Sequence, residues 1–163
     1  MVEQPERAGI SRKWLLIVAG AAGGAVAIAA MEWFSAFSEF PLASIPFATS
    51  IVLVMGSPDA PPAQPRALIG GHLVSALVGM SVLAVAGPHA WAAAMAVGLA
   101  IVAMHATRTF HPPAGINPLL IVTNALPWSF VVVPVAAGAL LLAVFAWTWH
   151  NIGREKNWPN QWW

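Results

Sequence analysis

The sequence predicts an all-α membrane protein, a bundle of four transmembrane helices with two short re-entrant or broken helices. Hydrophobic residues make up 59% of the 163 residues and charged residues only 8%, whereas soluble domains carry about 25% charged residues. The mean hydropathy is +0.74. Eight of the thirteen charged residues lie near the ends of the chain, at Glu3, Glu6, Arg7, Arg12, Lys13, Arg154, Glu155 and Lys156.

Four apolar segments are long enough to be transmembrane helices, given a hydrocarbon core about 30 Å thick and a rise of about 1.5 Å per residue. These predicted spans are residues 14–34, 65–86, 91–107 and 128–150. Two shorter apolar segments, 45–55 and 118–124, suit re-entrant or broken helices better than full spans. The predicted organisation is therefore an N-terminal tail, a transmembrane domain and a C-terminal tail, with the bounds 1–13, 14–150 and 151–163.

The distribution of positive charge predicts that both tails are cytoplasmic. Four spans place the two tails on the same side, with five of the seven Lys and Arg residues inside and only Arg66 and Arg108 outside, as the positive-inside rule requires. A fifth crossing by 45–55 would move the C-terminal charges outside. Six crossings, with both short segments passing through, also keep the tails together and remain an alternative.

Small residues mark faces where helices are expected to pack closely. Gly20 and Gly24 form a GxxxG step in the first span, and Gly71, Ser75 and Gly79 recur every four residues in the second. Such faces allow helix backbones to approach one another within a membrane. The tripeptide 61–63, Pro-Pro-Ala, also recurs at 112–114, which is a weak sign of an internal repeat.

The stretch 107–118 interrupts the helices and is predicted to be the functional centre. Pro112 and Pro113 lack backbone N–H groups and disfavour helical geometry in the residues before them. Asn117 followed by Pro118 is typical of a helix start, with Asn117 as the N-cap. The same stretch holds Arg108 and His111, polar groups that are costly within a membrane.

Arg66 and Arg108 are predicted to bind a small oxyanion. Arg66 lies at the start of the second span, and Arg108 lies close to the helix start near Pro118. A helix N-terminus offers unpaired N–H groups and about half a positive charge, and each arginine adds a full charge. The alternative is that both side chains reach the lipid headgroups at the membrane surface. His105 and His111 are candidate proton relays, and a structural role for these two and for His72 is an equal alternative.

Several other functions are excluded or disfavoured. The chain has no cysteine, so it has no disulfide, thiol chemistry or Cys-ligated zinc. Its net charge of +1 and scattered basic residues do not suit a nucleic-acid partner. His72, His105 and His111 match no metal-ligand spacing. We therefore expect no metal, no cofactor and no enzymatic activity.

Three blocks of sequence resemble the HPP family of integral membrane proteins. They are residues 107–115 (TRTFHPPAG), 46–56 with PFATS and VLVMG, and 64–79 (QPRALIGGHLVSALVG). The resemblance implies a four-span bundle and, from chloroplast and cyanobacterial relatives, nitrite transport. Ala48, Ile116 and Pro118 depart from the family pattern. The short N-terminal tail suits a bacterial inner membrane better than a plastid, because it is too short for a transit peptide.

These observations predict a transporter or channel for a small monovalent anion, with nitrite as the substrate by resemblance. The predicted substrate-binding residues are Arg66, Arg108, His111, Asn117, His72, His105, Gln64 and Ser50. Because four spans form a thin wall around a pathway, a homo-oligomer in the lipid bilayer is expected. The alternative function is a non-transporting membrane scaffold or accessory subunit that binds partner helices.

Overall fold

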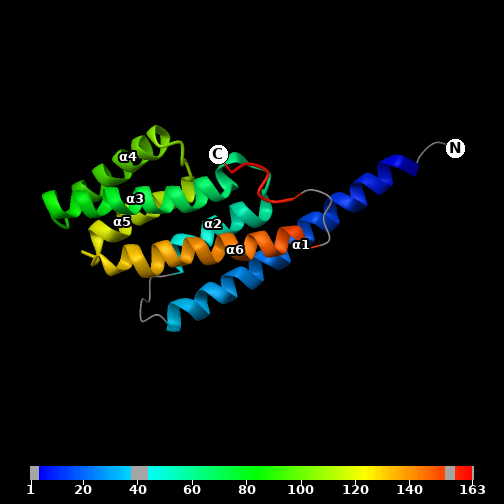
Figure 1. Ribbon diagram of the computed structural model, residues 1–163, viewed down its shortest axis with the longest axis horizontal. Helices are drawn as coiled ribbons and strands as arrows, with labels where there is room; N and C mark the ends of the chain where they lie inside the picture. Colours follow the sequence, from blue (N-terminus) through cyan, green and yellow to red (C-terminus); the bar gives the residue numbers. More distant parts are fainter. Residues whose placement is uncertain (1–3, 38–43, 153–156, 163) are drawn as a thin grey trace.

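The computed structural model describes residues 4–37, 44–152 and 157–162, and these residues form helices joined by short connections (Figure 1). The α-helices are α1 (Gln4–Phe37), α2 (Ile45–Gly56), α3 (Pro65–Ala86), α4 (Ala90–Ala106), α5 (Ile116–Thr123) and α6 (Gly138–Asn151). Two 3-10 turns, η1 (Pro61–Ala63) and η2 (Pro112–Gly115), precede α3 and α5, and a π-helical segment, η3 (Val131–Ala137), leads into α6. The predicted all-α class is confirmed.

Three helices are long and apolar enough to cross a membrane: Arg12–Phe37, Pro65–Ala86 and Val131–Asn151. Less than half of each apolar window is buried within the bundle, so the remaining apolar side chains are available to lipid. Helix α4 has 17 residues and α2 has 12, lengths of about 25 Å and 18 Å at 1.5 Å per residue. Among the residues that the structure describes, three helices are thus of spanning length and α2, α4 and α5 are shorter, so the predicted number of four spans is not confirmed.

Successive helices run in alternating directions, as Figure 1 shows. A Cβ placed on Gly20 of α1 would lie 2.6 Å from the Met55 carbonyl oxygen, and Gly24 faces Ile51, so α2 runs back along α1. Helix α6 is parallel to α2, since Phe47 packs at Gly138 and His150 Nε2 lies 3.0 Å from the Val54 carbonyl oxygen. Helix α2 therefore returns the chain in the direction of the N-terminal end of α1, as far as Gly20.

This return corrects the predicted placement of Arg66 and Arg108 on the side opposite the C-terminal tail. Backbone N–H groups of Asn160 and Gln161 donate to Gln64 Oε1 at 3.1 and 3.3 Å, beside the first turn of α3. Arg66 therefore lies at the same end of the bundle as the C-terminal segment. The order of directions matches the six-segment alternative, in which α2 and α5 both carry the chain along the bundle.

The structure describes parts of both predicted tails. Residues 1–13 were predicted to be an N-terminal tail, and α1 is helical from Gln4. Residues 151–163 were predicted to be a C-terminal tail, and within them 157–162 pack on the bundle. Trp158 is 4% exposed and belongs to the core formed with α1, α2 and α6. Its burial and the bonds to Gln64 keep this segment against the start of α3.

The small residues of α3 pack where the sequence predicts. A Cβ on Gly71 would lie 2.6 Å from His111 Cβ, and a Cβ on Gly79 would lie 2.7 Å from Pro118 Cα. Both contacts bring the broken stretch 107–118 directly against α3. The predicted close-packing face is confirmed, and its partner is the η2–α5 segment.

Two helix starts show how proline acts locally. Pro65 begins α3 at the position where a missing N–H costs nothing. Helix α5 begins at Ile116, one residue earlier than Asn117, and Gly115 occupies the cap position without a side-chain bond. The predicted N-cap role of Asn117 is therefore wrong, because its amide is engaged elsewhere. Pro134 lies within η3, where wider π-helical turns accommodate its missing donor.

Candidate functional site: a buried polar cluster

Five polar side chains from three helices and one connection meet inside the bundle. Each is 0% exposed. We call this group the polar cluster; its members are Ser50, His72, Ser75, His111 and Asn117. His72 is the eighth residue of α3, about 10 Å along the helix at 1.5 Å per residue, so the cluster lies well inside the bundle.

The Ser50 hydroxyl links the two histidines. Its Oγ lies 2.9 Å from His72 Nε2 and 2.9 Å from His111 Nε2. It also lies 3.3 Å from the Pro46 carbonyl oxygen, one turn earlier in α2. On its other side, His111 Nδ1 lies 2.6 Å from the carbonyl oxygen of Pro62 in η1. One short helix, one long helix and both Pro-Pro-Ala turns are thereby joined.

Asn117 closes the other side of the polar cluster. Its Nδ2 lies 3.0 Å from His72 Nδ1 and donates to the His72 carbonyl at 3.1 Å and to Ser75 Oγ at 2.9 Å. Ser75 in turn donates to the His72 carbonyl at 3.1 Å. Asn117 Oδ1 is buried without a hydrogen-bond partner. Such an orphan acceptor is uncommon in folded proteins.

The local sequence explains how the broken stretch reaches this depth. Helix α4 ends at Ala106, and Arg108 then adopts a positive φ of 56°, which turns the chain inward. Gly70 and Gly71 leave space for Thr109 and for the His111 backbone. The Pro112–Gly115 turn then separates His111 from Asn117, so that both side chains reach the same face of α3.

Burial lowers the pKa of His111, which lies in the connection between α4 and α5, from 6.5 to about 4. Desolvation penalises the charged imidazolium, and the bond to the Pro62 carbonyl offsets only part of that penalty. His111 is therefore neutral at pH 7.

Arg66, Arg108 and His105 lie outside the polar cluster, near the end of the bundle where α3 begins and α4 ends. We call them the arginine edge. Arg66 is half-buried and its Nη2 donates to the Thr107 carbonyl at 3.1 Å, whereas Arg108 and His105 are exposed. His105 stacks on Phe110 with ring centroids 4.1 Å apart. The structure thus separates these three from Ser50, His72, His111 and Asn117.

A pocket of about 450 Å³ lies beside Arg66. Its lining includes Gly70, Thr107, Thr109 and Trp162, and the two threonine hydroxyls lie 2.7 Å apart. No member of the polar cluster lines this pocket, and Thr109 precedes His111 by two residues. Gln64 lies nearby, and its Nε2 donates to the Pro58 carbonyl at 2.8 Å. This bond stabilises the connection between α2 and α3.

Comparison with known proteins assigns the family. The family model for the HPP transmembrane region matches residues 10–159. The chain belongs to the HPP family. Two curated transmembrane proteins of Dictyostelium discoideum match over 126 residues, at 43% and 40% identity. The match covers 72% of this chain but only 40% and 44% of those relatives, so the chain spans less than half of their length. No solved structure matches.

The resemblance seen in the sequence is thus confirmed, and this HPP chain is a membrane protein. Sequence reasoning missed Ser75, Thr109 and the Pro62 carbonyl as parts of the site. Ser75 had a visible signal, because it lies one turn after His72 on the small-residue face. The Pro62 carbonyl had none, since a backbone group carries no sequence signature.

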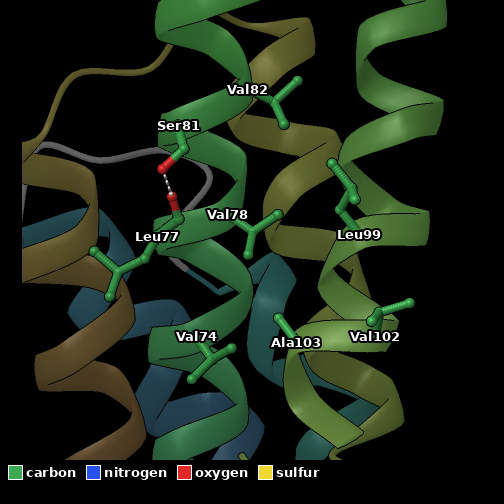
Figure 2. Close-up of a pocket in the computed structure, with 8 residues that line it drawn as sticks. All are labelled: Val74, Leu77, Val78, Ser81, Val82, Leu99, Val102 and Ala103. Carbon is green, nitrogen blue, oxygen red and sulfur yellow. Dashed lines mark hydrogen bonds between the residues drawn. The ribbon is translucent and has the colours of Figure 1, made fainter. Parts of the chain in front are cut away.

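A larger surface groove of about 520 Å³ lies between α3 and α4. Figure 2 shows that apolar side chains line it, including Val78, Val82 and Leu99, and that Ser81 donates back to the Leu77 carbonyl at 2.9 Å. None of the predicted site residues lines this groove. Among the described residues, no three His, Asp or Glu side chains gather closely enough to hold a metal ion.

Proposed function

We propose that this HPP-family chain is a transporter or channel for a small monovalent anion, with nitrite as the first candidate. The observation that carries the proposal is the polar cluster between two interrupted helical segments, with an arginine-bearing pocket toward the end of the bundle. Buried polar groups inside a membrane are costly. Interrupted helices near the centre of a membrane domain are a common way to build a transport site.

The first step of the proposed pathway is capture at the arginine edge. Arg66 lines the pocket and adds a positive charge beside the Thr109 hydroxyl. A charge-assisted hydrogen bond contributes about 1.5–3 kcal/mol. The half-buried position of Arg66 raises this contribution above that of a fully solvated charge, because partial burial weakens screening.

The second step is passage past the polar cluster. Gly71 and Gly79 allow η2 and α5 to lie in direct contact with α3, so the hydrogen bonds from Asn117 to α3 are the side-chain links between these surfaces. A small displacement of η2 and α5 would expose His111 and the orphan Asn117 group to the pocket. We propose that this displacement opens the pathway.

The proposal also covers the membrane in which the protein lies, its orientation and its assembly. We propose a bacterial inner membrane with both termini cytoplasmic, supported by the positive charges near the two ends of the chain. A homo-oligomer would thicken the wall that the short helices α2 and α5 leave thin. The proposed activity is non-enzymatic and uses no metal or cofactor.

Reconstituted liposomes provide the test. Nitrite entry should saturate with concentration, and Arg66→Ala should lower apparent affinity at least tenfold. Arg108→Ala is measured beside it, since the sequence predicted the same loss there. Lys13→Ala removes one positive charge from exposed α1 and should leave nitrite entry unchanged. Empty liposomes at two pH values correct for nitrous acid, which crosses bilayers unaided. Unchanged entry in both arginine variants would contradict the proposed site.

A scaffold that binds partner helices is the second candidate. The polar cluster satisfies most of its own hydrogen bonds, and the groove between α3 and α4 offers an apolar surface. This function predicts no saturable flux by the purified protein. It also predicts that a large side chain at Val78 or Leu99 blocks crosslinking to a partner.

A further inference from the structure

The polar cluster contains two imidazoles joined by one hydroxyl, and this arrangement restricts where its protons lie. A neutral imidazole has one donor and one acceptor nitrogen, and a serine hydroxyl has a single proton to donate. The partners at the two ends of the cluster are the Pro62 carbonyl, which only accepts, and the Asn117 amide nitrogen, which only donates. These ends fix the direction of every bond between them.

The neutral cluster then has one consistent pattern. His111 Nδ1 donates to the Pro62 carbonyl, so its Nε2 must accept from Ser50. Asn117 Nδ2, whose two protons serve three neighbouring acceptors, faces His72 Nδ1, so His72 Nδ1 carries no proton and His72 Nε2 donates to Ser50. The orientation of the Asn117 amide is fixed because Nδ2 also donates to the His72 carbonyl, where an oxygen would face an oxygen.

An added proton fits at His111 without moving any heavy atom. Protonated His111 Nε2 would donate to Ser50 Oγ, and the Ser50 hydroxyl would turn to the Pro46 carbonyl, 3.3 Å away. Ser50 would then accept from both histidines and donate to Pro46. A proton on His72 Nδ1 would instead face the Asn117 N–H group, and turning that amide would place its oxygen against the His72 carbonyl.

We propose that His111 is the proton-binding site of the transporter, that Ser50 switches its hydroxyl from His111 to Pro46 on protonation, and that proton and anion favour each other's binding. This coupling rests on the proposed anion transport. The proton comes from water, binds the Nε2 lone pair and returns to water when the anion leaves. An anion near His111 stabilises the imidazolium, and by linkage the imidazolium stabilises the anion equally.

The groups around His111 support this assignment. From α3 the titratable neighbour is His72, with ring centroids 5.2 Å apart, and a charge on one ring opposes a charge on the other. From α2 and η1 the facing groups are the Ser50 hydroxyl and the Pro62 carbonyl, both uncharged. Arg66 and Arg108 lie on the arginine edge, where an anion would offset their charge. We therefore expect only one of the two histidines, His72 or His111, to be charged at a time.

Nitrogen NMR of the purified protein with ¹⁵N-labelled histidine tests the proton site independently of transport. At neutral pH, His111 should carry its proton on Nδ1 and His72 on Nε2. On acidification, His111 should take a second proton while His72 keeps its tautomer. His111→Asn assigns the signals and keeps a donor toward Pro62. Ser81→Ala, which removes an exposed α3 hydroxyl outside the polar cluster that donates to the Leu77 carbonyl, should leave this order unchanged, whereas Ser50→Ala should abolish the coupling between the two rings.

Proton uptake on nitrite addition in weakly buffered solution tests the coupling. Nitrite should bind about tenfold more tightly at pH 5 than at pH 7, with proton uptake in the wild type and in Ser81→Ala but not in His111→Asn. Nitrite binding without proton uptake would overturn the coupling and leave the proposed function intact. Absence of nitrite binding at both pH values would overturn the proposed function and the coupling together. Protonation of His72 before His111 would overturn the proton site itself.

Discussion

The polar cluster and the arginine edge both hold residues that the sequence assigned to the anion site, but they differ in burial. In the polar cluster, every side chain is fully buried and bonded to groups from other segments. On the arginine edge, Arg108 and His105 are exposed, and the half-buried Arg66 donates to the Thr107 carbonyl at 3.1 Å. The cluster side chains therefore contribute to the fold, while the exposed side chains of Arg108 and His105 can meet a ligand at small cost to stability.

The largest expected loss of stability comes from replacing Asn117 in the polar cluster. Asn117→Ala deletes the donor to His72 and Ser75 and leaves a small cavity, so it should lower the free energy of unfolding by about 4 kcal/mol. Asn124 makes one exposed bond to the Leu120 carbonyl, and Asn124→Ala should cost less than about 0.5 kcal/mol. Unfolding in mixed micelles measures both, and equal losses would contradict a special role for the cluster.

Acidification should weaken the fold through His111. Its folded-state pKa of about 4 lies below the ordinary value of 6.5, so below pH 6.5 the unfolded chain binds a proton that the folded chain does not. Stability is therefore lost as pH falls from 6.5 to 4, by about 3 kcal/mol at 1.36 kcal/mol for each unit of pKa difference. Thermal unfolding against pH measures this loss. His111→Asn should flatten the curve in that range, and an unchanged curve would place the titrating group elsewhere.

Filling the contact at Gly71 should separate packing from hydrogen bonding. An added Cβ would lie 2.6 Å from His111 Cβ and 2.7 Å from the Thr109 carbonyl oxygen, so Gly71→Ala should destabilise by about 2 kcal/mol. Gly98 of α4 has nothing within 4 Å, and Gly98→Ala should stabilise by about 0.5–1 kcal/mol through helix propensity. If Gly71→Ala leaves the free energy of unfolding unchanged, η2 can move away from α3 at little cost.

The sequence predicts the parts of this fold that depend on local signals. Pro65 begins α3 and Gly87 follows its end with a φ of 73°, a conformation that glycine adopts readily. The prolines at 112–113 interrupt the chain because each restricts its own backbone. The direction of α2 could not be predicted by length alone, since a helix of 12 residues suits either a half-crossing or a return. That direction decided the side on which Arg66 and Arg108 lie.

In the candidate site too, some features had a local sequence signal and others depended on tertiary structure. Ser50, His72 and His111, which were chosen from the sequence, are buried in the bundle, and Gly71, Ser75 and Gly79 indicated the packing face. The separation of Arg108 from His111 had no sequence signal, because it depends on a positive φ at a non-glycine residue. Asn117 was assigned to a cap because asparagine before proline is typical of one, whereas tertiary hydrogen bonds hold its side chain inside.

The smallest expected effect concerns the backbone of Arg108. Its φ of 56° is left-handed, a conformation that costs a non-glycine residue about 1–2 kcal/mol. Arg108→Gly should therefore stabilise the fold by about 0.5–1 kcal/mol, after the larger entropy of glycine in the unfolded chain is subtracted. Ala125, exposed with a φ of 49°, is the matched control, and Ala125→Gly should gain a similar amount.

Measuring nitrite entry by the Arg108→Gly variant then separates the contribution of Arg108 to stability from its contribution to transport. A variant that is more stable and takes up less nitrite would show that the strained backbone is retained for the side chain, as is common at functional sites. A variant that loses stability would show instead that the Arg108 side chain holds the edge together. In that case the edge would resemble the polar cluster, and the distinction between the two regions would fail.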